Sequence, residues 1–248
     1  MTRVNKRNAC VTDLNLIDYE EAWKFQSCLV TARHQGRLPL DVCLLLEHYP
    51  VMTLGKRGGR ENLIVPERFL ENRQIPLIQV ERGGDITYHG PGQLVVYVIS
   101  DLDEQKCDVT TFVSMLEETV IRTLKNYGVR GDRLPLNRGV FVSGQKIGSV
   151  GLALRKGVTF HGLSLNVNLS LEPFSWINPC GLKDIRMTTI QNEIKEDVQM
   201  AEVKQIIKSH LEDVFSLSLH DKTRDDLETI AGFSGIKTAS AKNEAAHA

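Results

Sequence analysis

The 248-residue sequence predicts a single α+β domain in which helices flank a mixed β-sheet. Strand-like segments predominate in the middle of the chain, and helical periodicity occurs before, between and after them. Between Asp18 and Leu219 there is neither an internal repeat nor a linker. A chain of this length can bury most of its apolar surface, so a single domain accounts for all these segments.

Helices are predicted where apolar residues recur at three- and four-residue spacing, or where a proline suits a first turn. The ranges are Asp18 to Gln35, Pro66 to Asn72, Asp108 to Tyr127 and Ala201 to Ser216. Asp108 is a favourable N-cap, because its carboxylate can accept hydrogen bonds from free N–H groups of the first turn. Gly128 is a favourable residue for ending the same helix.

Strands are predicted where compact or alternating apolar runs lie between turn residues. The ranges are Asp41 to Glu47, Val51 to Leu54, Pro76 to Val80, Gln93 to Ser100, Val140 to Val142, Lys146 to Leu154 and Val158 to Leu169. In the last of these, Leu163 and Leu165 alternate with Ser164. One face therefore belongs to the core, and the other can line a polar site through Ser164 and His161.

The end of the chain has a different composition. Beyond about Asp221 it becomes polar and alanine-rich, with only scattered apolar residues. The sequence predicts a catalytic domain over residues 1–220 and a weakly ordered, dispensable tail over residues 221–248.

Composition excludes several classes of function. The formal net charge is -1, which gives no electrostatic reason to expect nucleic acid or an anionic membrane as a partner. The N-terminal residues lack the apolar region of a secretory signal. Apolar runs such as Leu94 to Ile99 are too short to cross a bilayer. We therefore expect a cytoplasmic protein.

The five cysteines are scattered, and no pair has the C-x-x-C spacing typical of zinc and redox sites. Most free cysteines are small buried hydrophobic residues. Cys180 differs because it lies between Pro179 and Gly181, in a rigid and open local backbone. A thiol reacts as its thiolate, and a nearby lysine ammonium would lower its pKa.

A glycine-rich segment, Arg82 to Gln93, contains four glycines and a proline among polar and ionisable residues. It could be a solvated loop between two strands. A connection between strands is usually shorter, and glycines allow a backbone to approach a ligand closely, so ligand binding is favoured. Neither common phosphate-binding glycine pattern occurs in it.

Lys146 lies between glycines at the start of a predicted strand. Taken alone, it would be interpreted as a surface residue of a hairpin. The alternative is a lysine at the rim of a site whose backbone is left bare by Gly148 and Gly151.

Four segments in this order, Arg82 to Gln93, Lys146 to Gly151, Thr159 to Asn166 and Pro179 to Gly181, resemble the octanoyltransferases of lipoate biosynthesis. The match covers about residues 15 to 215. Gly148 and Ser164 stand where many members carry alanine, and both are small replacements. The resemblance implies a fold like the catalytic domain of biotin and lipoate protein ligases.

The resemblance also implies a mechanism without ATP or metal. Cys180 would attack the thioester of octanoyl acyl carrier protein, while Lys146 would lower the pKa of the thiol and act as acid and base. Octanoate would then pass to a lysine ε-amine of a lipoyl domain, in the first step of protein lipoylation. The expected acyl-site residues are Arg82, Gly83, Gly84, Asp85, Ile86, Thr87, Tyr88, His89, Ser149, Val150, Gly151, Gly162, Leu163 and Ser164.

The expected partners are acyl carrier protein, the lipoyl domains of 2-oxoacid dehydrogenase E2 subunits and the glycine cleavage H protein, with a monomeric enzyme. Two other functions remain open. An ATP-dependent lipoate or biotin ligase would need a phosphate-binding loop and would have no use for Cys180. A non-catalytic acyl-binding or lipoyl-domain-binding module would keep the glycine-rich segment and tolerate loss of the cysteine. The oxyanion could be held by N–H groups near Gly181 or by the Gly83–Gly84 loop.

Overall fold

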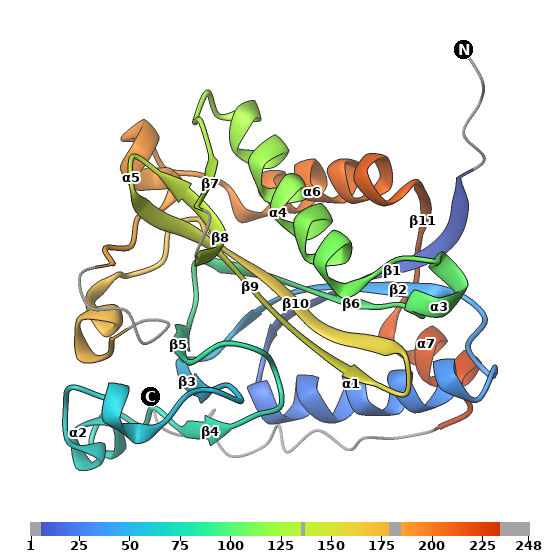
Figure 1. The fold of residues 1–248 in the computed structure, drawn as a ribbon, viewed down its shortest axis with the longest axis horizontal. Coiled ribbons are helices and arrows are strands. Elements are labelled where there is room, and N and C mark those ends of the chain that lie inside the picture. The colour runs from blue at the N-terminus through green and yellow to red at the C-terminus, as the bar shows by residue number, and fades with distance from the viewer. Residues whose placement is uncertain (1–5, 135–136, 179–184, 234–248) are drawn as a thin grey trace, which may run out of the picture.

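The computed structural model describes residues 6–134, 137–178 and 185–233. Within them, eight strands form a mixed sheet in the order β11-β1-β2-β6-β10-β9-β8-β7 (Figure 1). Strand β1 runs parallel to β2 and β11, and the remaining neighbours are antiparallel. The strands are β1 (Arg7–Ile17), β2 (Asp41–His48), β6 (Gln93–Ile99), β7 (Asp132–Leu134), β8 (Asn137–Val142), β9 (Gln145–Arg155), β10 (Val158–Asn166) and β11 (Leu217–Asp221).

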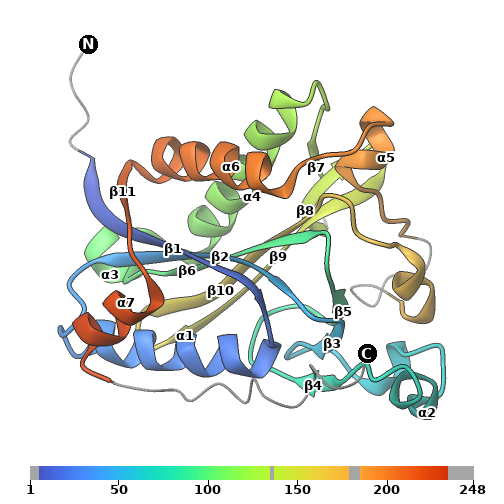
Figure 2. The ribbon, with the colours of Figure 1, turned by 180° about the vertical axis from the view of Figure 1, so that it is seen from behind.

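Helices cover both faces of this sheet, and the predicted α+β class is confirmed. Helices α4 (Val109–Asn126) and α6 (Met200–Phe215) lie on one face, and α1 (Tyr19–His34) and α7 (Arg224–Ala231) lie on the other (Figures 1 and 2). The predicted caps are present: Asp108 accepts a hydrogen bond from the N–H of Thr111, and Asp18 caps α1 in the same way. Short helices α3 (Leu102–Gln105) and α5 (Ile190–Ile194) lie in connections.

Three further strands form a small sheet in the order β4-β3-β5 beside the N-terminal end of α1 (Figure 1). They are β3 (Val51–Leu54), β4 (Leu77–Gln79) and β5 (Ile86–His89). Together with the short helices η1 (Arg60–Asn62), α2 (Glu67–Glu71) and η2 (Glu172–Trp176), they enclose a separate apolar cluster that includes Met52 and Phe174. Strand β5 lies inside the glycine-rich segment. Its pairing with β3 holds this segment in the small sheet.

The prediction of a weakly ordered segment after Asp221 is wrong for residues 222–233. Thr223 and Asp226 form a capping box at the start of α7, and Leu227 is fully buried in the cluster around Phe25. So short a helix presents only one narrow apolar stripe, which is why the sequence pattern did not reveal it. Residues 234–248 lie outside those that the structure describes.

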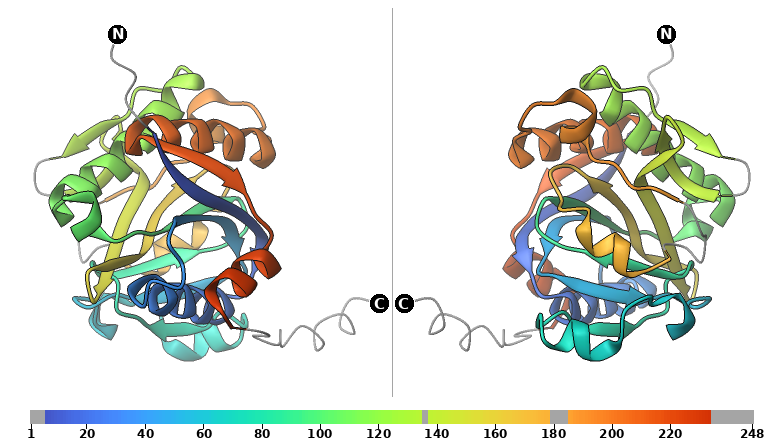
Figure 3. Two further views of the ribbon diagram at one scale, coloured as in Figure 1. Left: turned by 90° about the vertical axis from the view of Figure 1, so that its right-hand side faces the viewer. Right: turned by 90° about the vertical axis from the view of Figure 1, so that its left-hand side faces the viewer.

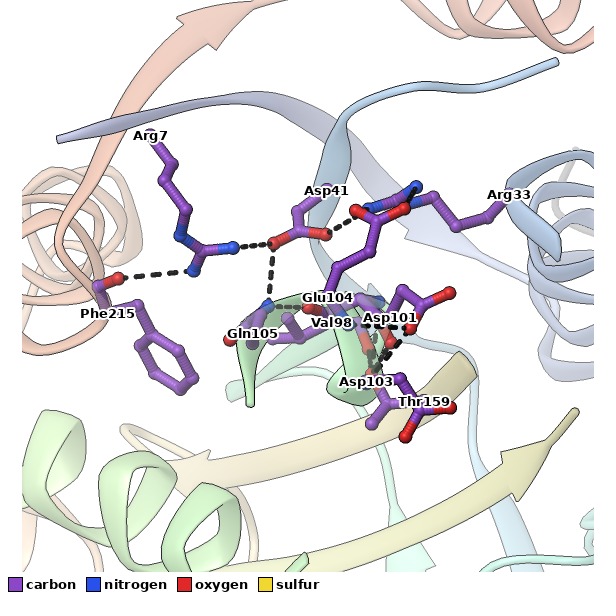
Figure 4. A network of polar contacts seen from close by, with 11 residues as sticks. Arg7, Arg33, Asp41, Val98, Asp101, Asp103, Glu104, Gln105, Thr159 and Phe215 are labelled. Carbon is purple, nitrogen blue, oxygen red and sulfur yellow. Dashed lines mark hydrogen bonds and ion pairs between the residues drawn. The ribbon is translucent and has the colours of Figure 1, made fainter. Parts of the chain in front are cut away.

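A partly buried ion-pair network fixes α3 against the start of β2, a central strand of the main sheet (Figure 4). Asp41 of β2 accepts hydrogen bonds from Arg7 at 3.2 Å, Arg33 at 3.4 Å and Gln105 at 2.7 Å. Arg33 also pairs with Glu104 of α3 at 2.5 Å. The side chains of Arg33 and Asp41 are each only 4% exposed, so each charge depends on the other for compensation.

Candidate functional site

A cavity of about 690 Å³ lies between the main sheet and the small sheet. Its floor is formed by β9 and β10, where Ser149 pairs with Ser164 and Gly151 pairs with Gly162. The next strand, β6, adds residues that pair with this same stretch of β10. The glycine-rich segment closes the opposite side. The two sequence regions that were predicted to share a site are thus brought together by the fold.

Of the fourteen residues expected at the acyl site, all but one line this cavity, and so does Lys146. The exception is Tyr88, whose ring packs edge-on against Phe174 at 5.8 Å in the small-sheet cluster. It points away from the cavity because it lies between Thr87 and His89, and side chains alternate along a strand. Tyr88 is thus not among the residues that line this cavity, and its expected role at the acyl site stays a prediction.

Sequence reasoning missed several lining residues that come from ordinary helix, strand and loop segments. No local signal distinguishes them from core or surface positions, because only the tertiary fold turns them toward the cavity. They are Tyr19, Arg57, Asn62, Val95, Tyr97, Val109, Val113, Asn137, Arg138 and Leu152. His161, suggested only by the polar face of its strand, does line the cavity.

Lys146 is buried, with 2% of its surface exposed, and the interpretation as a surface hairpin residue is wrong. Its N–H donates to the carbonyl of Arg186 at 2.8 Å, and its own carbonyl accepts from the N–H of Thr188 at 2.9 Å. Its Nζ lies 5.5 Å from the centre of the Phe141 ring. Backbone pairing on both sides therefore fixes where the lysine enters the cavity.

Cys180 and its neighbours, residues 179–184, lie outside the described residues. The chain on either side of them is bound to cavity-lining residues. Before them, the N–H of Asn178 donates to the carbonyl of Asn62 at 2.8 Å. After them, Met187 forms a bridge with Lys146. The described residues on both sides of this segment are therefore bonded to residues that line the cavity.

Arg82 anchors the glycine-rich segment to the small sheet. Its Nη2 donates to the carbonyl of Thr53 at 2.7 Å and its Nε to the Thr53 hydroxyl at 3.2 Å. The N–H of Gly83 then donates to the carbonyl of Leu152 on β9 at 2.7 Å. A Cβ atom on Gly151 would stand 3.1 Å from the Gly83 carbonyl oxygen, so a glycine there allows this close approach.

A chain of amide side chains links His89 to the backbone beside Lys146. The Nδ1–H of His89 donates to Gln93 at 2.6 Å, and the Gln93 amide donates to Asn166 at 2.9 Å. The Asn166 amide donates to the carbonyl of Thr188 at 3.1 Å, and the N–H of Thr188 bonds Lys146. These buried hydrogen bonds fix the position of the His89 ring relative to the backbone of Lys146.

One part of the cavity wall is formed by aromatic side chains, among them Tyr97, His89 and His161, and His48 lies directly behind Tyr97. The imidazole rings in this group are uncharged. Burial lowers the pKa of His48 to about 4 and of His161 to about 3, and it lowers the pKa of His89 well below its usual value. His48 donates from Nδ1 to the carbonyl of Ile17 at 3.0 Å, so its Nε2 accepts from the Tyr97 hydroxyl at 2.7 Å. Neutral imidazoles and phenols favour an uncharged ligand there.

No group of three or more metal-ligating side chains occurs in the described part of the chain. Nor does any helix in those residues have the length and apolar character needed to cross a membrane.

Comparison with known proteins agrees with this arrangement. Residues 18–212 match the family described as the lipoyl protein ligase A/B catalytic domain. The octanoyltransferase of Desulfotalea psychrophila is 46% identical over 83% of this chain and 93% of its own length. The octanoyltransferase of Syntrophobacter fumaroxidans is 42% identical over 90% of this chain and 98% of its own length.

Solved structures with a similar fold are more distant in sequence. The bipartite lipoate protein ligase of Thermoplasma acidophilum superposes with a TM-score of 0.70 at 18% identity, covering 91% of each chain. A lipoate-protein ligase A bound with ATP gives a TM-score of 0.69 at 17% identity, covering 91% of this chain and 93% of the other. The fold is thus that of lipoate protein ligases, and the chain belongs to the lipoyl protein ligase A/B catalytic-domain family as one of its octanoyltransferases.

Proposed function

We propose that this chain transfers an octanoyl group from acyl carrier protein to the lysine ε-amine of a lipoyl domain through a thioester on Cys180. The observation that carries the proposal is a single cavity with a bare glycine floor and a buried lysine. The segment bearing Cys180 is flanked by Asn178 and Met187, which bond to the cavity-lining residues Asn62 and Lys146. The identity of 46% to an octanoyltransferase supports the choice of acyl group.

In the first step, the Cys180 thiolate attacks the thioester carbonyl of the donor. A new C–S bond forms to Cys180 and the C–S bond to the carrier breaks. The carrier thiolate takes a proton from the Lys146 ammonium and leaves as its thiol, so Lys146 enters the second step as a neutral amine. Exchange between two thioesters is close to isoenergetic, so the step needs no nucleotide. Lys146, as an ammonium, stabilises the attacking thiolate.

In the second step, the lipoyl-domain amine attacks the acyl enzyme, a C–N bond forms and the C–S bond to Cys180 breaks. The amine loses a proton as the amide forms, and Lys146 accepts it. The part of the cavity wall formed by Tyr97 and the neutral ring of His161 suits an acyl chain that carries no charge. We further propose that the enzyme acts as a cytoplasmic monomer on E2 lipoyl domains and the H protein.

An ATP-dependent ligase on the same fold is the competing assignment, because solved structures of similar fold include a ligase bound with ATP. Intact-mass measurement after mixing with octanoyl acyl carrier protein, without ATP, distinguishes the two. We expect an octanoyl adduct on the wild type and on Cys107→Ala, but none on Cys180→Ser. An adduct that requires ATP, or one that persists in Cys180→Ser, would refute the proposal. A binding module would form no adduct at all.

A further inference from the structure

His161 has an unusual backbone conformation for a residue inside a strand. Its φ is +60°, in the left-handed region that residues with a Cβ atom seldom adopt. The buried carboxamide of Gln26 in α1 accepts the His161 N–H at 2.7 Å, which holds the conformation in place. Strained backbone of this kind persists only where surrounding contacts impose it, and it is often found at functional sites.

This conformation turns the His161 ring toward the cavity. Neighbouring residues in a regular strand point to opposite faces, yet the His161 ring stacks on that of Phe160, with centroids 4.8 Å apart. It also meets Tyr97 edge-on at 5.8 Å, and both His161 and Tyr97 line the cavity. The ring therefore lies on the face that carries Gly162 and Ser164.

Neither ring nitrogen of His161 has a hydrogen-bond partner among the described residues, although the side chain is only 1% exposed. The Tyr97 hydroxyl is engaged with His48, so the adjacent polar group already has a partner. A buried polar group without a partner is costly, and a cavity with several polar groups can hold an ordered water. The imidazole thus needs a water, or a polar ligand atom, inside this cavity.

The strand register places the His161 imidazole and its water beyond the reach of a short acyl chain that starts beside Lys146. His161 pairs with Leu152, six residues along β9 from Lys146, a rise of about 20 Å. An extended eight-carbon acyl group, with C–C bonds of about 1.5 Å, is roughly 9 Å long. An octanoyl group held beside Lys146 ends well before the imidazole, whereas an extended chain of sixteen carbons, roughly 19 Å long, reaches the imidazole and must displace the water there.

We infer that His161 limits the length of acyl chain that the cavity accepts. Its imidazole holds an ordered water at the place where a longer apolar chain would have to lie. Displacing an ordered water by a group that cannot replace its hydrogen bonds reduces affinity. The inference rests on the proposed function, since it assigns the acyl chain to this cavity.

The test compares octanoyl with hexadecanoyl in two measurements: acylation of Cys180 by the two acyl carrier proteins, and calorimetric binding of the two free fatty acids. In His161→Leu, we expect the preference for the eight-carbon over the sixteen-carbon ligand to fall at least tenfold in both. His161→Asn, which tolerates a positive φ and keeps a hydrogen-bonding side chain, should retain most of the preference. Gln26→Leu, which removes the acceptor for the His161 N–H, should shift the preference in the same direction as His161→Leu.

An unchanged ratio of fatty-acid affinities in His161→Leu would overturn the inference, as would a wild-type protein that binds neither fatty acid. The binding measurement does not depend on catalysis. If binding discriminates by length through His161 while no thioester acylates Cys180, the proposed function fails and the inference stands.

Discussion

Gly139 of β8 lies against the side chain of Lys146: a Cβ atom on Gly139 would stand 2.8 Å from Cε of the lysine. The glycine also has a φ of +122°, which side-chain-bearing residues rarely adopt. The same Cβ atom would stand even closer to the backbone carbonyl oxygen of Gly148 on β9. We expect Gly139→Ala to shift this part of β9 together with the ammonium and to lower the rate of octanoyl transfer at least tenfold, measured with purified carrier and lipoyl domain.

Gly144, in the turn between β8 and β9, provides the matched control. Its φ is also positive, at +80°, but a Cβ atom there would meet nothing within 4 Å. Gly144→Ala should therefore cost about 1 kcal/mol of stability through backbone strain and leave the transfer rate unchanged. Equal losses of rate in the two variants would contradict the assignment of the Gly139 effect to Lys146.

The two proposed roles of Lys146 can be separated by substitution. Arginine keeps the positive charge but cannot give up a proton as a base. We expect Lys146→Arg to retain part of the reactivity of Cys180 toward an alkylating reagent at neutral pH while losing aminolysis of the acyl enzyme. Lys146→Ala should lose both. The pH dependence of alkylation is the measurement, and an unchanged profile in Lys146→Ala would exclude the dyad.

Because two buried histidines have lowered pKa values, we expect the free energy of unfolding to fall in mild acid. Burial lowers the pKa of His48 to about 4 and that of His161 to about 3, against about 6.5 in the unfolded chain. Between pH 6.5 and 4 the unfolded state binds protons that the folded state does not, so stability falls by about 1 kcal/mol per pH unit for each histidine. Above pH 6.5 neither state is charged at these rings, and they contribute no pH dependence.

Denaturant unfolding at a series of pH values measures this slope. His48→Gln should flatten it by about one histidine's share. A wild-type slope that survives in His48→Gln would mean that other groups cause the acid sensitivity.

Helix α7 should contribute measurably to stability. Leu227 is fully buried against the cluster of α1, and Leu227→Ala should lower the free energy of unfolding by about 2–5 kcal/mol. Ile230, on the same helix, is 36% exposed, and Ile230→Ala should cost about 1 kcal/mol or less. Equal midpoints in chemical denaturation would show that α7 does not pack as described.

Elements with a strong local pattern were predictable, because local pattern and tertiary packing agree in them. Helix α1 is an example: Asp18 caps it, and Phe25 and Leu29 lie on its buried face. Strand β1 was missed because its register shifts between Asp13 and Asn15, where a positive φ interrupts the alternation of side chains.

The candidate site was predictable where several unusual residues share one segment, as around Gly83, and not where a single residue depends on its neighbours in space. Lys146 has no local mark of burial, and only pairing with Arg186 and Thr188 fixes it in the interior. Tyr97 lies in a fully apolar run, so its part in the cavity wall depends on which face the second sheet covers.

The parallel pairing of β1 with β11, seen side by side in Figure 3, joins Arg7 to Leu217 across nearly the whole sequence. During synthesis on the ribosome, the outer edge of β1 must wait for residues 217–221 before it gains its neighbour. Until then its unpaired N–H and C=O groups form a template for adhesion to other nascent chains. Pairing of β1 with β11 joins residues that are far apart in the sequence, and such pairing is intrinsically slow. The nascent enzyme is therefore most prone to aggregation just before β11 emerges.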